Sequence, residues 1–378
     1  MNIKEFKSGR QVTQLDYKSF IPELINREWI LSNPGIQTLL EEANLRLGSL
    51  EAFSLIVPDV NIFIRMHIVK EATKSNLIEG TQTQMEEVVL KERDINPEKR
   101  DDWREVQNYI EALNFSVRQL EKLPLSSRLF RKTHEILLQG VRGKYKQPGN
   151  FRKSQNWIGG SSIKDAVFIP PPHHMVNKLM SDLENFINND GIHVPHLIRI
   201  AIAHYQFETI HPFLDGNGRL GRLMITLYLV QFNILHKPTL YLSDFFEKHK
   251  SLYYDNLTGV RTKNDLTQWI KFFLVAVVET SKKAIDAFKE ILRLRAEIED
   301  EKIITLGKKL PLAKELIIYL YKRPVITAID LQEDLKITAP TANGIIRDFE
   351  KLGILREQTG YKRNRIFVFE EYLNLFKR

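Results

Sequence analysis

Apolar residues recur at intervals of three and four along most of the chain, and Pro and Gly residues stand where the pattern breaks. That spacing is typical of helices that turn one face to a core. It is clearest in residues 39–50, 61–80, 101–140, 176–186, 196–207 and 269–292. We therefore predict a mainly α-helical protein. Before residue 60, Pro22, Pro34 and Pro58 interrupt the pattern, so we expect only short helices there.

One segment in the middle of the chain, residues 143–172, lacks helical spacing. Two short runs of β-forming residues, 155–158 and 166–169, flank a Gly-Gly-Ser-Ser turn, and three prolines follow at 170–172. We predict a β-hairpin. A lone hairpin in a helical protein has an open strand edge. It is either a surface ribbon or an edge to which an extended segment of another protein can add as a strand.

The last part of the chain, residues 305–378, has a pattern of its own. Three helical runs precede two strand-like runs, at 311–321, 326–335, 340–352, 354–357 and 365–369. Thr338 is expected to cap the third helix, with Pro340 just inside its first turn. This order resembles a winged helix-turn-helix domain, which implies DNA as a partner.

The charges in this part leave its partner open. In the third helix Arg347 and Lys351 are offset by Asp348 and Glu350, whereas the tip at 361–365 is basic. A DNA-reading helix places its side chains in the major groove, and a basic tip would contact phosphates. The alternative to DNA binding is a docking or dimerisation module.

The length of 378 residues allows two or three domains. We predict an N-terminal helical region (1–100), a central helical domain that carries the chemistry (101–300) and the small C-terminal domain (305–378). A charged connector at 293–302 joins the last two. The expected fold class is mainly α, a helical core with a β-hairpin, followed by a small α+β domain.

Composition restricts the chemistry more than the fold. The chain has no cysteine, which excludes disulfides, thiol nucleophiles and cysteine zinc sites. Its net charge of +8 is compatible with a nucleotide or nucleic-acid partner. The start, Met1-Asn-Ile-Lys, lacks the apolar core of a signal peptide, and no apolar run is long enough to span a bilayer. We expect a cytoplasmic protein with no membrane partner.

The densest chemistry lies in His211-Pro-Phe-Leu-Asp-Gly-Asn-Gly-Arg-Leu-Gly-Arg222. Between two apolar runs, it predicts a helix, a tight loop and a second helix. Glycines permit the turn, and backbone N–H groups at the start of the second helix form an anion site. Arg219 and Arg222 share one helix face and can hold an oxyanion. His211 can accept a proton and Asp215 can bind Mg²⁺ beside phosphates.

Each of these residues also has an ordinary structural explanation. A histidine near a helix end is usually a hydrogen-bonded structural residue, a Gly-x-Gly is usually a turn, and an arginine pair on a helix is usually a solvated face. Their combination within one short stretch favours phosphate-ester chemistry on a nucleotide. His204, on the preceding helix, is expected to be a hydrogen-bonded core residue and not a metal ligand.

The stretch resembles the signature of the Fic family, His-Pro-Phe-x-(Asp/Glu)-Gly-Asn-Gly-Arg-x-x-Arg, at every specified position. The resemblance implies transfer of AMP from ATP to a protein hydroxyl, with His211 as base and Asp215 holding Mg²⁺. Asn217 and the loop backbone would cradle the α- and β-phosphates, and Arg219 and Arg222 the β- and γ-phosphates. The implied nucleotide site comprises Asp215, Gly216, Asn217, Gly218, Arg219, Leu220, Gly221 and Arg222.

A second motif, Ser75-Asn-Leu-Ile-Glu79-Gly80, ends the helix predicted for 61–80. Alone, Glu79 would be an ordinary surface carboxylate. The motif is similar to the inhibitory sequence (Ser/Thr)-x-x-x-Glu-(Gly/Asn) of many Fic proteins. That resemblance implies that Glu79 pairs with Arg222 and blocks the γ-phosphate. In some relatives the same glutamate is linked to removal of AMP, so the direction of the reaction stays open.

Two further elements are assigned by the same resemblance. The hairpin corresponds to a flap that holds a segment of the target protein, and Asn156, Trp157, Ile158 and Gly159 would contact the nucleotide or the target backbone. Tyr253 and Tyr254 would lie near the adenine. Relatives can have an asparagine one helical step beyond this tyrosine pair, where this chain has Arg261, so the base selectivity stays open.

The sequence as a whole therefore favours a self-inhibited protein adenylyltransferase that uses Mg²⁺-ATP. One alternative is a nucleotide-sensing, DNA-binding regulator whose site binds nucleotide with little turnover. Another is a related enzyme that transfers a different group or mainly removes AMP. The target protein and the modified residue are not indicated. A homodimer is expected from family analogy alone.

Overall fold

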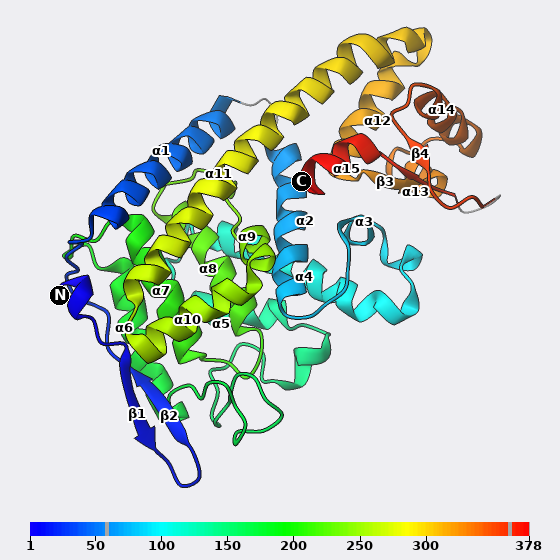
Figure 1. The fold of residues 1–378 in the computed structure, drawn as a ribbon. Helices are drawn as coiled ribbons and strands as arrows, with labels where there is room; N and C mark the ends of the chain where they lie inside the picture. Colours follow the sequence, from blue (N-terminus) through cyan, green and yellow to red (C-terminus); the bar gives the residue numbers. More distant parts are fainter. Residues whose placement is uncertain (57–59, 362–364, 378) are drawn as a thin grey trace.

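Two helices that pack against each other, α7 (His196–Ile210) and α8 (Asn217–Gln231), carry the loop that holds the 211–222 motif (Figure 1). Every residue of α7 after His196 is buried, so other helices cover α7 on all sides. The computed structural model describes residues 1–56, 60–361 and 365–377, and only the backbone of 61–63. Pro58, expected to break a helix, lies outside these residues.

The helices around this pair follow the predicted apolar stripes. The stripe at 39–50 lies within one long helix, α1, which begins at Pro34 and packs along α11 (Figure 1). The bounds are α1 (Pro34–Ile56), α2 (Val60–Ile78), α3 (Met85–Val88), η2 (Glu92–Asp94), η3 (Pro97–Lys99), α4 (Arg100–Gln119), α5 (Ser127–Leu137), η4 (Arg142–Tyr145), η5 (His173–Met175), α6 (Val176–Asn188), α9 (Ser243–Lys248), α10 (Lys250–Lys263) and α11 (Leu266–Ala296).

The prediction of short helices at the very N-terminus was wrong. After η1 (Ile3–Glu5), the chain forms an antiparallel hairpin of β1 (Gly9–Thr13) and β2 (Lys18–Pro22). Gly9 has a φ of +149°, and a Cβ there would lie 2.2 Å from the carbonyl oxygen of Ile21. Close backbone approach, not helical spacing, therefore governs this segment. The prolines mark the end of β2 and the start of α1.

The hairpin predicted for 155–158 and 166–169 is present only as one antiparallel bridge, between Ile158 and Phe168. The turn between them is held by Asp165, whose carboxylate accepts hydrogen bonds from Ser161 and Ser162. The N–H group of Phe20 in β2 donates to the carbonyl oxygen of Ile169 at 2.9 Å. The second run is thus attached to the N-terminal hairpin, and the segment has too few ladder bonds to form regular strands.

In its described residues, the C-terminal part contains four α-helices and a small antiparallel sheet with strand order β3-β5-β4. Thr338 caps α14 as predicted, accepting a hydrogen bond from the N–H group of Thr341. The elements are η6, a π-helix (Glu297–Lys302), η7 (Ile303–Lys309), α12 (Leu310–Lys322), β3 (Val325–Thr327), α13 (Ala328–Asp334), α14 (Ala339–Lys351), β4 (Arg356–Glu357), β5 (Ile366–Val368) and α15 (Glu370–Lys377).

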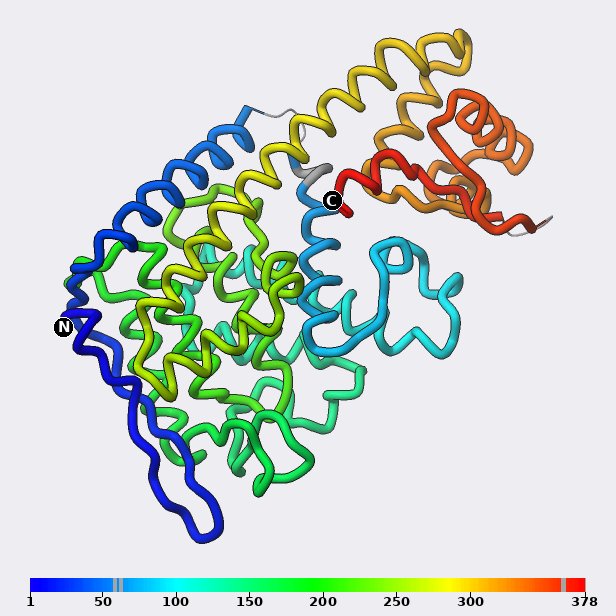
Figure 2. Tube along the Cα trace, in the orientation of Figure 1, coloured from blue at the N-terminus to red at the C-terminus, as the bar shows by residue number. Residues whose placement is uncertain are grey.

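Three details of this part differ from the expectation. The second predicted helix starts later, because residues 325–327 form β3 and Thr327 caps α13. The charged connector at 293–302 is helical and continues α11. A last helix, α15, returns the C-terminus to α2 and α11 (Figure 2). Residues 362–364, most of the predicted basic tip, lie outside the described part of the chain.

Candidate active site

The 211–222 loop begins where α7 ends. His211 caps α7 in the left-handed region at a φ of 50°, and its N–H group donates to the carbonyl oxygen of Phe207. Gly216, with a φ of 74°, starts α8. A branched residue could not adopt this conformation without strain. The predicted order of helix, tight loop and helix is confirmed.

Side chains from other elements hold the loop in shape. The Asn217 amide accepts from the N–H group of Phe213 and donates to its carbonyl oxygen, at 2.8 and 2.9 Å. His134 of α5 stacks on the Phe213 ring with centroids 3.8 Å apart. Because the N–H group of Gly149 donates to Nδ1 of His134, Nε2 carries the proton and donates to the carbonyl oxygen of Asp215.

The Asn217 side chain has a structural role that the sequence did not predict. It is buried, spans the loop and hydrogen-bonds both backbone groups of Phe213. The backbone at this place keeps the predicted anion-binding character, because the first N–H groups of a helix have no acceptor within the helix. The N–H group of Leu220, which donates to the carbonyl oxygen of Gly216, makes the first backbone bond of α8.

Arg222 lies in a buried contact with α2. Its Nε donates to the Ser75 hydroxyl at 2.9 Å, and its Nη2 donates to the Ser75 carbonyl oxygen at 2.9 Å and to Oε1 of Glu79 at 2.6 Å. Arg222 is 2% exposed, and the Glu79 side chain is 34% exposed. Burial alone would raise the pKa of Glu79, but Arg222 outweighs it and the net shift is downward. The pair is thus a charged one at neutral pH.

The Glu79 carboxylate also lies against the first turn of α8. A Cβ placed on Gly218 would come within 2.3 Å of Oε1 of Glu79 and 3.0 Å of Nη1 of Arg222. Glycine at this position therefore lets a carboxylate approach the helix N-terminus and the guanidinium together. An anion at such a place is favoured by both charges. The carboxylate fills the position that the sequence suggests for an oxyanion.

Arg219, the second arginine of the motif, is buried and pairs with Glu105 of α4. Its Nη1 donates to Oε2 of Glu105 at 2.9 Å and to the Asn76 side chain at 3.3 Å. Both arginines thus face α2, and each already has a carboxylate partner. Glu105 and Asn76 were not identified from the sequence, because nothing in their local pattern sets them apart from other residues of amphipathic helices.

His211 lies beside two guanidinium groups. Burial, together with Arg261 and Arg152, lowers the pKa of His211 to about 3, so its imidazole is neutral at physiological pH. Its Nδ1 has no hydrogen-bond partner among the described residues. The Nε atom of Arg152 donates to the carbonyl oxygen of His211 at 2.9 Å and so fixes the backbone of this residue. The neutral ring can therefore accept a proton.

Asp215 is the carboxylate that the sequence suggests for Mg²⁺. Its side chain is 42% exposed and lies 3.7 Å from Arg219. Within the described residues, no group of three or more His, Cys, Asp or Glu side chains could hold a metal by itself. A magnesium ion bound mainly through substrate phosphates needs only one or two carboxylates. The exposed Asp215 fits that kind of site.

Family comparisons agree with this geometry. The N-terminal domain of the Fic/DOC family matches residues 37–118, and the Fic/DOC domain itself matches residues 124–229. The chain is a Fic family protein. The first match includes α2 with Ser75 and Glu79, and the second includes the 211–222 loop. The two halves of the Arg222–Glu79 contact thus come from different matched domains.

Curated relatives of this Fic protein are named protein adenylyltransferases. One, from Culex quinquefasciatus, is 30% identical over 141 residues, which are 37% of this chain and 25% of the relative. A probable protein adenylyltransferase from Aquifex aeolicus is 29% identical over 136 residues, 34% of this chain and 40% of the relative. The matched region therefore spans a quarter to two fifths of these relatives.

Solved Fic structures share the fold. A Fic family protein from Desulfovibrio desulfuricans superposes with a TM-score of 0.57 at 21% identity, covering 91% of this chain and 98% of that one. Fic-1 of Caenorhabditis elegans gives a TM-score of 0.54 at 19% identity, covering 69% and 75%. The mainly helical fold class is thereby confirmed.

The flap residues of this Fic protein fall into two groups. Asn156 is buried, and its amide donates to the carbonyl oxygens of His211 and Phe213 at 3.2 and 2.9 Å. Its amide nitrogen thus supports the loop instead of reaching a nucleotide or a target. Trp157 is 42% exposed, and Ile158 and Gly159 lie at the surface around the single bridge. The backbone N–H and carbonyl groups of Ile158 already pair with the 166–169 run, so Trp157 and Gly159 are the two whose backbone groups the bridge does not use.

The two tyrosines that the resemblance places near the adenine differ in burial. Tyr253 is buried, and its hydroxyl donates to Nε2 of His204, whose Nδ1 donates to the carbonyl oxygen of Gly221. His204 is thus the hydrogen-bonded core histidine that we predicted. Tyr254 is 40% exposed. Arg261 is used locally, with its guanidinium 4.0 Å from the centre of the Phe168 ring in the flap.

Two motif positions assigned to the nucleotide are structural. Leu220 is fully buried in the core. A Cβ on Gly221 would lie 2.2 Å from Oε1 of Glu208 and 3.1 Å from the Phe207 ring, so glycine lets α7 and α8 approach closely. Glu208 itself was missed. It is buried, and its Oε1 has no hydrogen-bond partner among the described residues.

Proposed function

We propose that this protein transfers AMP from ATP to a hydroxyl group of a target protein, and that Glu79 holds it in an inhibited state. One observation carries the proposal. The Glu79 carboxylate accepts a hydrogen bond from the Arg222 guanidinium and lies against the first turn of α8, where an incoming phosphate would find its two strongest attractions. The names of the relatives support AMP as the transferred group.

In the proposed reaction, the neutral His211 takes the proton from a Ser, Thr or Tyr hydroxyl of the target. The freed oxygen attacks the α-phosphorus of ATP and forms a new P–O bond. The bond from the α-phosphorus to the bridging oxygen breaks, and diphosphate leaves. Mg²⁺, held at Asp215, would neutralise phosphate charge. Arg219, Arg222 and the N–H groups of α8 stabilise the charge that develops on the diphosphate.

Inhibition follows from competition for one guanidinium. A phosphate and the Glu79 carboxylate cannot both occupy the fork of Arg222. Burial strengthens this competition, because a buried charge pair is costly to break when one partner is left alone. ATP could then bind only with its terminal phosphate displaced, and the α-phosphorus would not be in line for attack.

The two proposed partners, the target protein and DNA, would contact different parts of the chain. The exposed edge at 157–159 would receive an extended segment of the target, since the run at 166–169 is already attached to β2. The C-terminal part, with a capped α14 and a small sheet, is the candidate contact for DNA. Among the described residues, Arg365 lies near Glu350, so part of the basic tip is offset by an acidic neighbour.

Incubation with labelled ATP and Mg²⁺ tests the proposal without a known target, by following AMP attached to the protein itself. We compare the native protein, Glu79→Gly, and Glu79→Gly with His211→Ala. We expect weak labelling of the native protein, strong labelling of Glu79→Gly, on the order of a hundredfold more, and none of the double variant. Removing the carboxylate frees Arg222, and removing the imidazole eliminates the base.

If nucleotide binds but no variant takes up label, the transferase proposal fails. The native protein would then be tested on an AMP-modified substrate, because AMP removal uses the same site. A matched control is Glu92→Gly, which removes an exposed carboxylate that pairs with Arg104 and not with Arg222. Its labelling should equal that of the native protein.

A further inference from the structure

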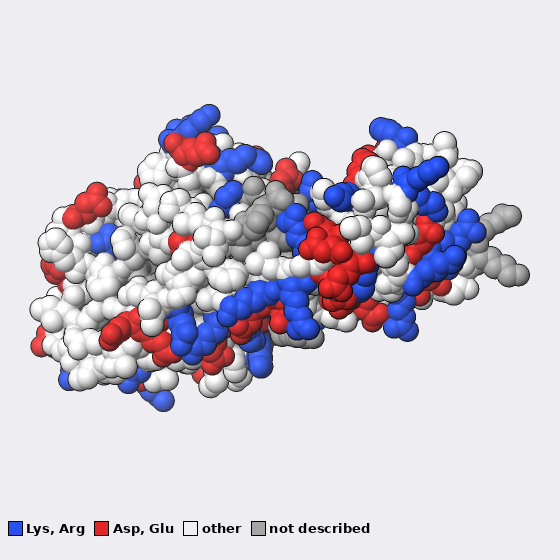
Figure 3. Space-filling model, turned by 90° about the horizontal axis from the view of Figure 1, so that it is seen from above, with Lys and Arg blue, Asp and Glu red and all other residues white. Residues whose placement is uncertain are grey.

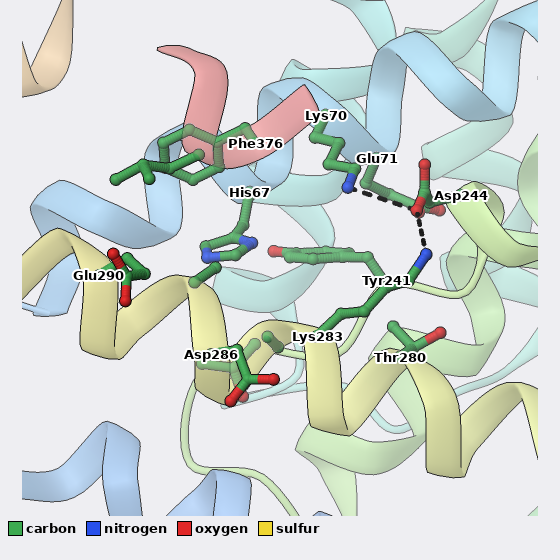
Figure 4. A pocket seen from close by; sticks show the side chains of 14 residues that line it. His67, Lys70, Glu71, Tyr241, Asp244, Thr280, Lys283, Asp286, Glu290 and Phe376 are labelled. Atoms are coloured by element: carbon green, nitrogen blue, oxygen red, sulfur yellow. Dashed lines mark ion pairs between the residues drawn. The ribbon is translucent and has the colours of Figure 1, made fainter. Parts of the chain in front are cut away.

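A cavity outside the 211–222 site lies between α2, the segment that leads into α9, and the helices α11 and α15 (Figure 4). Its volume is about 290 Å³. Six of the residues that line it determine its shape and polarity: His67, Thr239, Tyr241, Asp244, Ala287 and Phe376. Pockets for drug-sized ligands begin at about 300 Å³, so this cavity suits a molecule of one or two rings.

The walls of the cavity are largely aromatic and aliphatic. The His67 ring packs on Phe376 of α15 and on Phe288 of α11, with ring centroids 5.0 Å apart in each case. The Tyr241 ring extends towards His67 across the cavity (Figure 4). Ala287 presents a small side chain to the same space. Flat rings that face a narrow space favour a flat ligand.

Three polar atoms at this cavity have no hydrogen-bond partner among the described residues: Nε2 of His67, Oγ1 of Thr239 and Oη of Tyr241. Their residues are 8%, 1% and 7% exposed. Leaving such a buried group unpaired costs about 1 to 3 kcal/mol. Burial keeps His67 neutral, with a pKa lowered to about 3. Each of the three groups can therefore donate or accept one hydrogen bond to a neutral ligand.

The charges around the cavity argue against an anionic ligand. Lys70 and Lys283 both lie close to Asp244, at 3.3 and 3.6 Å, and these ion pairs engage both amines (Figure 4). Asp286 and Glu290 of α11 stand exposed at the mouth. An anion would meet two carboxylates on its way in, whereas a neutral molecule would not be repelled.

We propose that this cavity binds a small, neutral aromatic molecule of one or two rings with hydrogen-bonding groups at its edge. We further propose that this binding is coupled to the Arg222–Glu79 contact. The second half rests on the proposed function of the 211–222 site. The cavity and that site share α2, where His67, Glu71, Ser75 and Glu79 recur at every fourth residue and form one slowly turning stripe.

Contacts along this stripe connect the two ends. The Glu71 carboxylate accepts from the hydroxyls of Tyr109 and Ser243, at 3.0 and 2.5 Å. Ser243 directly precedes Asp244 of the cavity. At the other end, Lys250 of α10 donates to the carbonyl oxygen of Ile78 at 2.6 Å. The segment from the cavity through α9 to α10 therefore holds the last turn of α2, just before Glu79.

Calorimetric titration of the whole protein tests the binding site. The probes are 6-hydroxyquinoline, which has a donor and an acceptor at its edges, and quinoline, which lacks the hydroxyl group. We expect 6-hydroxyquinoline to bind at least fivefold more tightly, since one added hydrogen bond contributes about 1 kcal/mol. Ala287→Leu fills the cavity and should abolish binding. Thr239→Val keeps the shape and should weaken binding about fivefold.

Tyr228→Phe is the control for a change elsewhere in the core, because it removes a buried tyrosine hydroxyl that does not line the cavity. Its affinity for 6-hydroxyquinoline should equal that of the native protein. Absence of binding to the native protein overturns the proposal, and so does binding that survives both Ala287→Leu and Thr239→Val. The isosteric valine variant keeps the test valid if the leucine variant does not fold.

Linkage tests the connection to Glu79 without any catalytic readout. If the cavity and the Glu79 contact are coupled, removing that contact must change the affinity for the probe. We expect Glu79→Gly to alter the dissociation constant of 6-hydroxyquinoline about fivefold. Equal affinities in the two proteins overturn the coupling. This result does not depend on AMP transfer, so a failure of the proposed function is recognised separately by the labelling experiment.

Discussion

Two groups of ion pairs in this Fic protein have the same chemistry but different surroundings. The buried pairs, Arg222–Glu79 and Arg219–Glu105, involve arginines that are 2% and 5% exposed. The α13 cluster joins Lys91 and Arg93 to carboxylates of α13 at 2.8 to 3.0 Å, with most of these side chains partly exposed. On the face drawn in Figure 3, many Lys and Arg side chains stand next to Asp and Glu side chains.

The difference lies in what replaces a lost partner. In the α13 cluster, water and neighbouring charges take over, so each pair contributes little. In the buried pairs, an arginine without its carboxylate keeps a charge that the interior cannot solvate. Such an arginine binds any anion that reaches it. The same arginine–carboxylate geometry therefore stabilises the fold only weakly at the surface, whereas in the interior it provides a binding site for an anionic ligand.

Glu105→Ala gives the largest expected effect. It leaves Arg219 buried with only the Asn76 side chain as a described hydrogen-bond partner. We expect the free energy of unfolding to fall by about 4 kcal/mol, as is typical when one partner of a buried pair is removed. Urea unfolding, followed by circular dichroism, measures it.

Arg142→Ala is the control for Glu105→Ala. Arg142 contacts the same carboxylate at 2.8 Å, but its side chain is 60% exposed. Its loss should cost less than about 1 kcal/mol. Equal costs for the two variants would contradict the distinction between buried and exposed pairs.

Glu208→Gln tests a buried carboxyl group that forms no ion pair with another described residue. Burial, only partly offset by Arg222, raises the pKa of Glu208 to about 7. A folded pKa above the unfolded value means that folding favours the protonated form. Stability from this group is then present below about pH 4.5 and lost as the pH rises through 7. Glutamine does not titrate, so it avoids this loss.

The measured quantity is the unfolding free energy of Glu208→Gln minus that of the native protein, at pH 5 and at pH 8. We expect this difference to increase by about 3 kcal/mol between the two values. Parallel pH profiles for the two proteins would mean that Glu208 does not titrate in this range.

The sequence predicted the loop well because its structure is encoded locally. Gly216 at a positive φ and the helix that follows it come from one short stretch. The Arg222–Glu79 contact spans 143 positions, and only the resemblance to known proteins suggested it. The Glu105 partner of Arg219 has no motif of its own. Long-range pairs depend on how helices pack, which helical spacing does not specify.

Elsewhere, backbone contacts decided against the local pattern. The N-terminal hairpin forms although prolines suggested broken helices, because β1 and β2 pair along their length and Gly9 allows the close approach. The flap has strand-like residues but only one bridge, because its second run is attached to β2. Asn217 and Asn156 were assigned to ligands, yet buried backbone groups of the loop use their amides.

The α13 cluster provides the smallest expected effect. Glu333 accepts from both Lys91 and Arg93 and is 45% exposed. We expect Glu333→Ala to lower the unfolding free energy only slightly at low salt, far less than Glu105→Ala does. In 1 M NaCl the screening length falls to about 3 Å, and the difference from the native protein should vanish. The Glu105→Ala cost should persist in the same salt, because burial excludes the ions that screen the surface. A Glu333→Ala cost that survives 1 M NaCl would mean that the α13 cluster, too, is effectively buried.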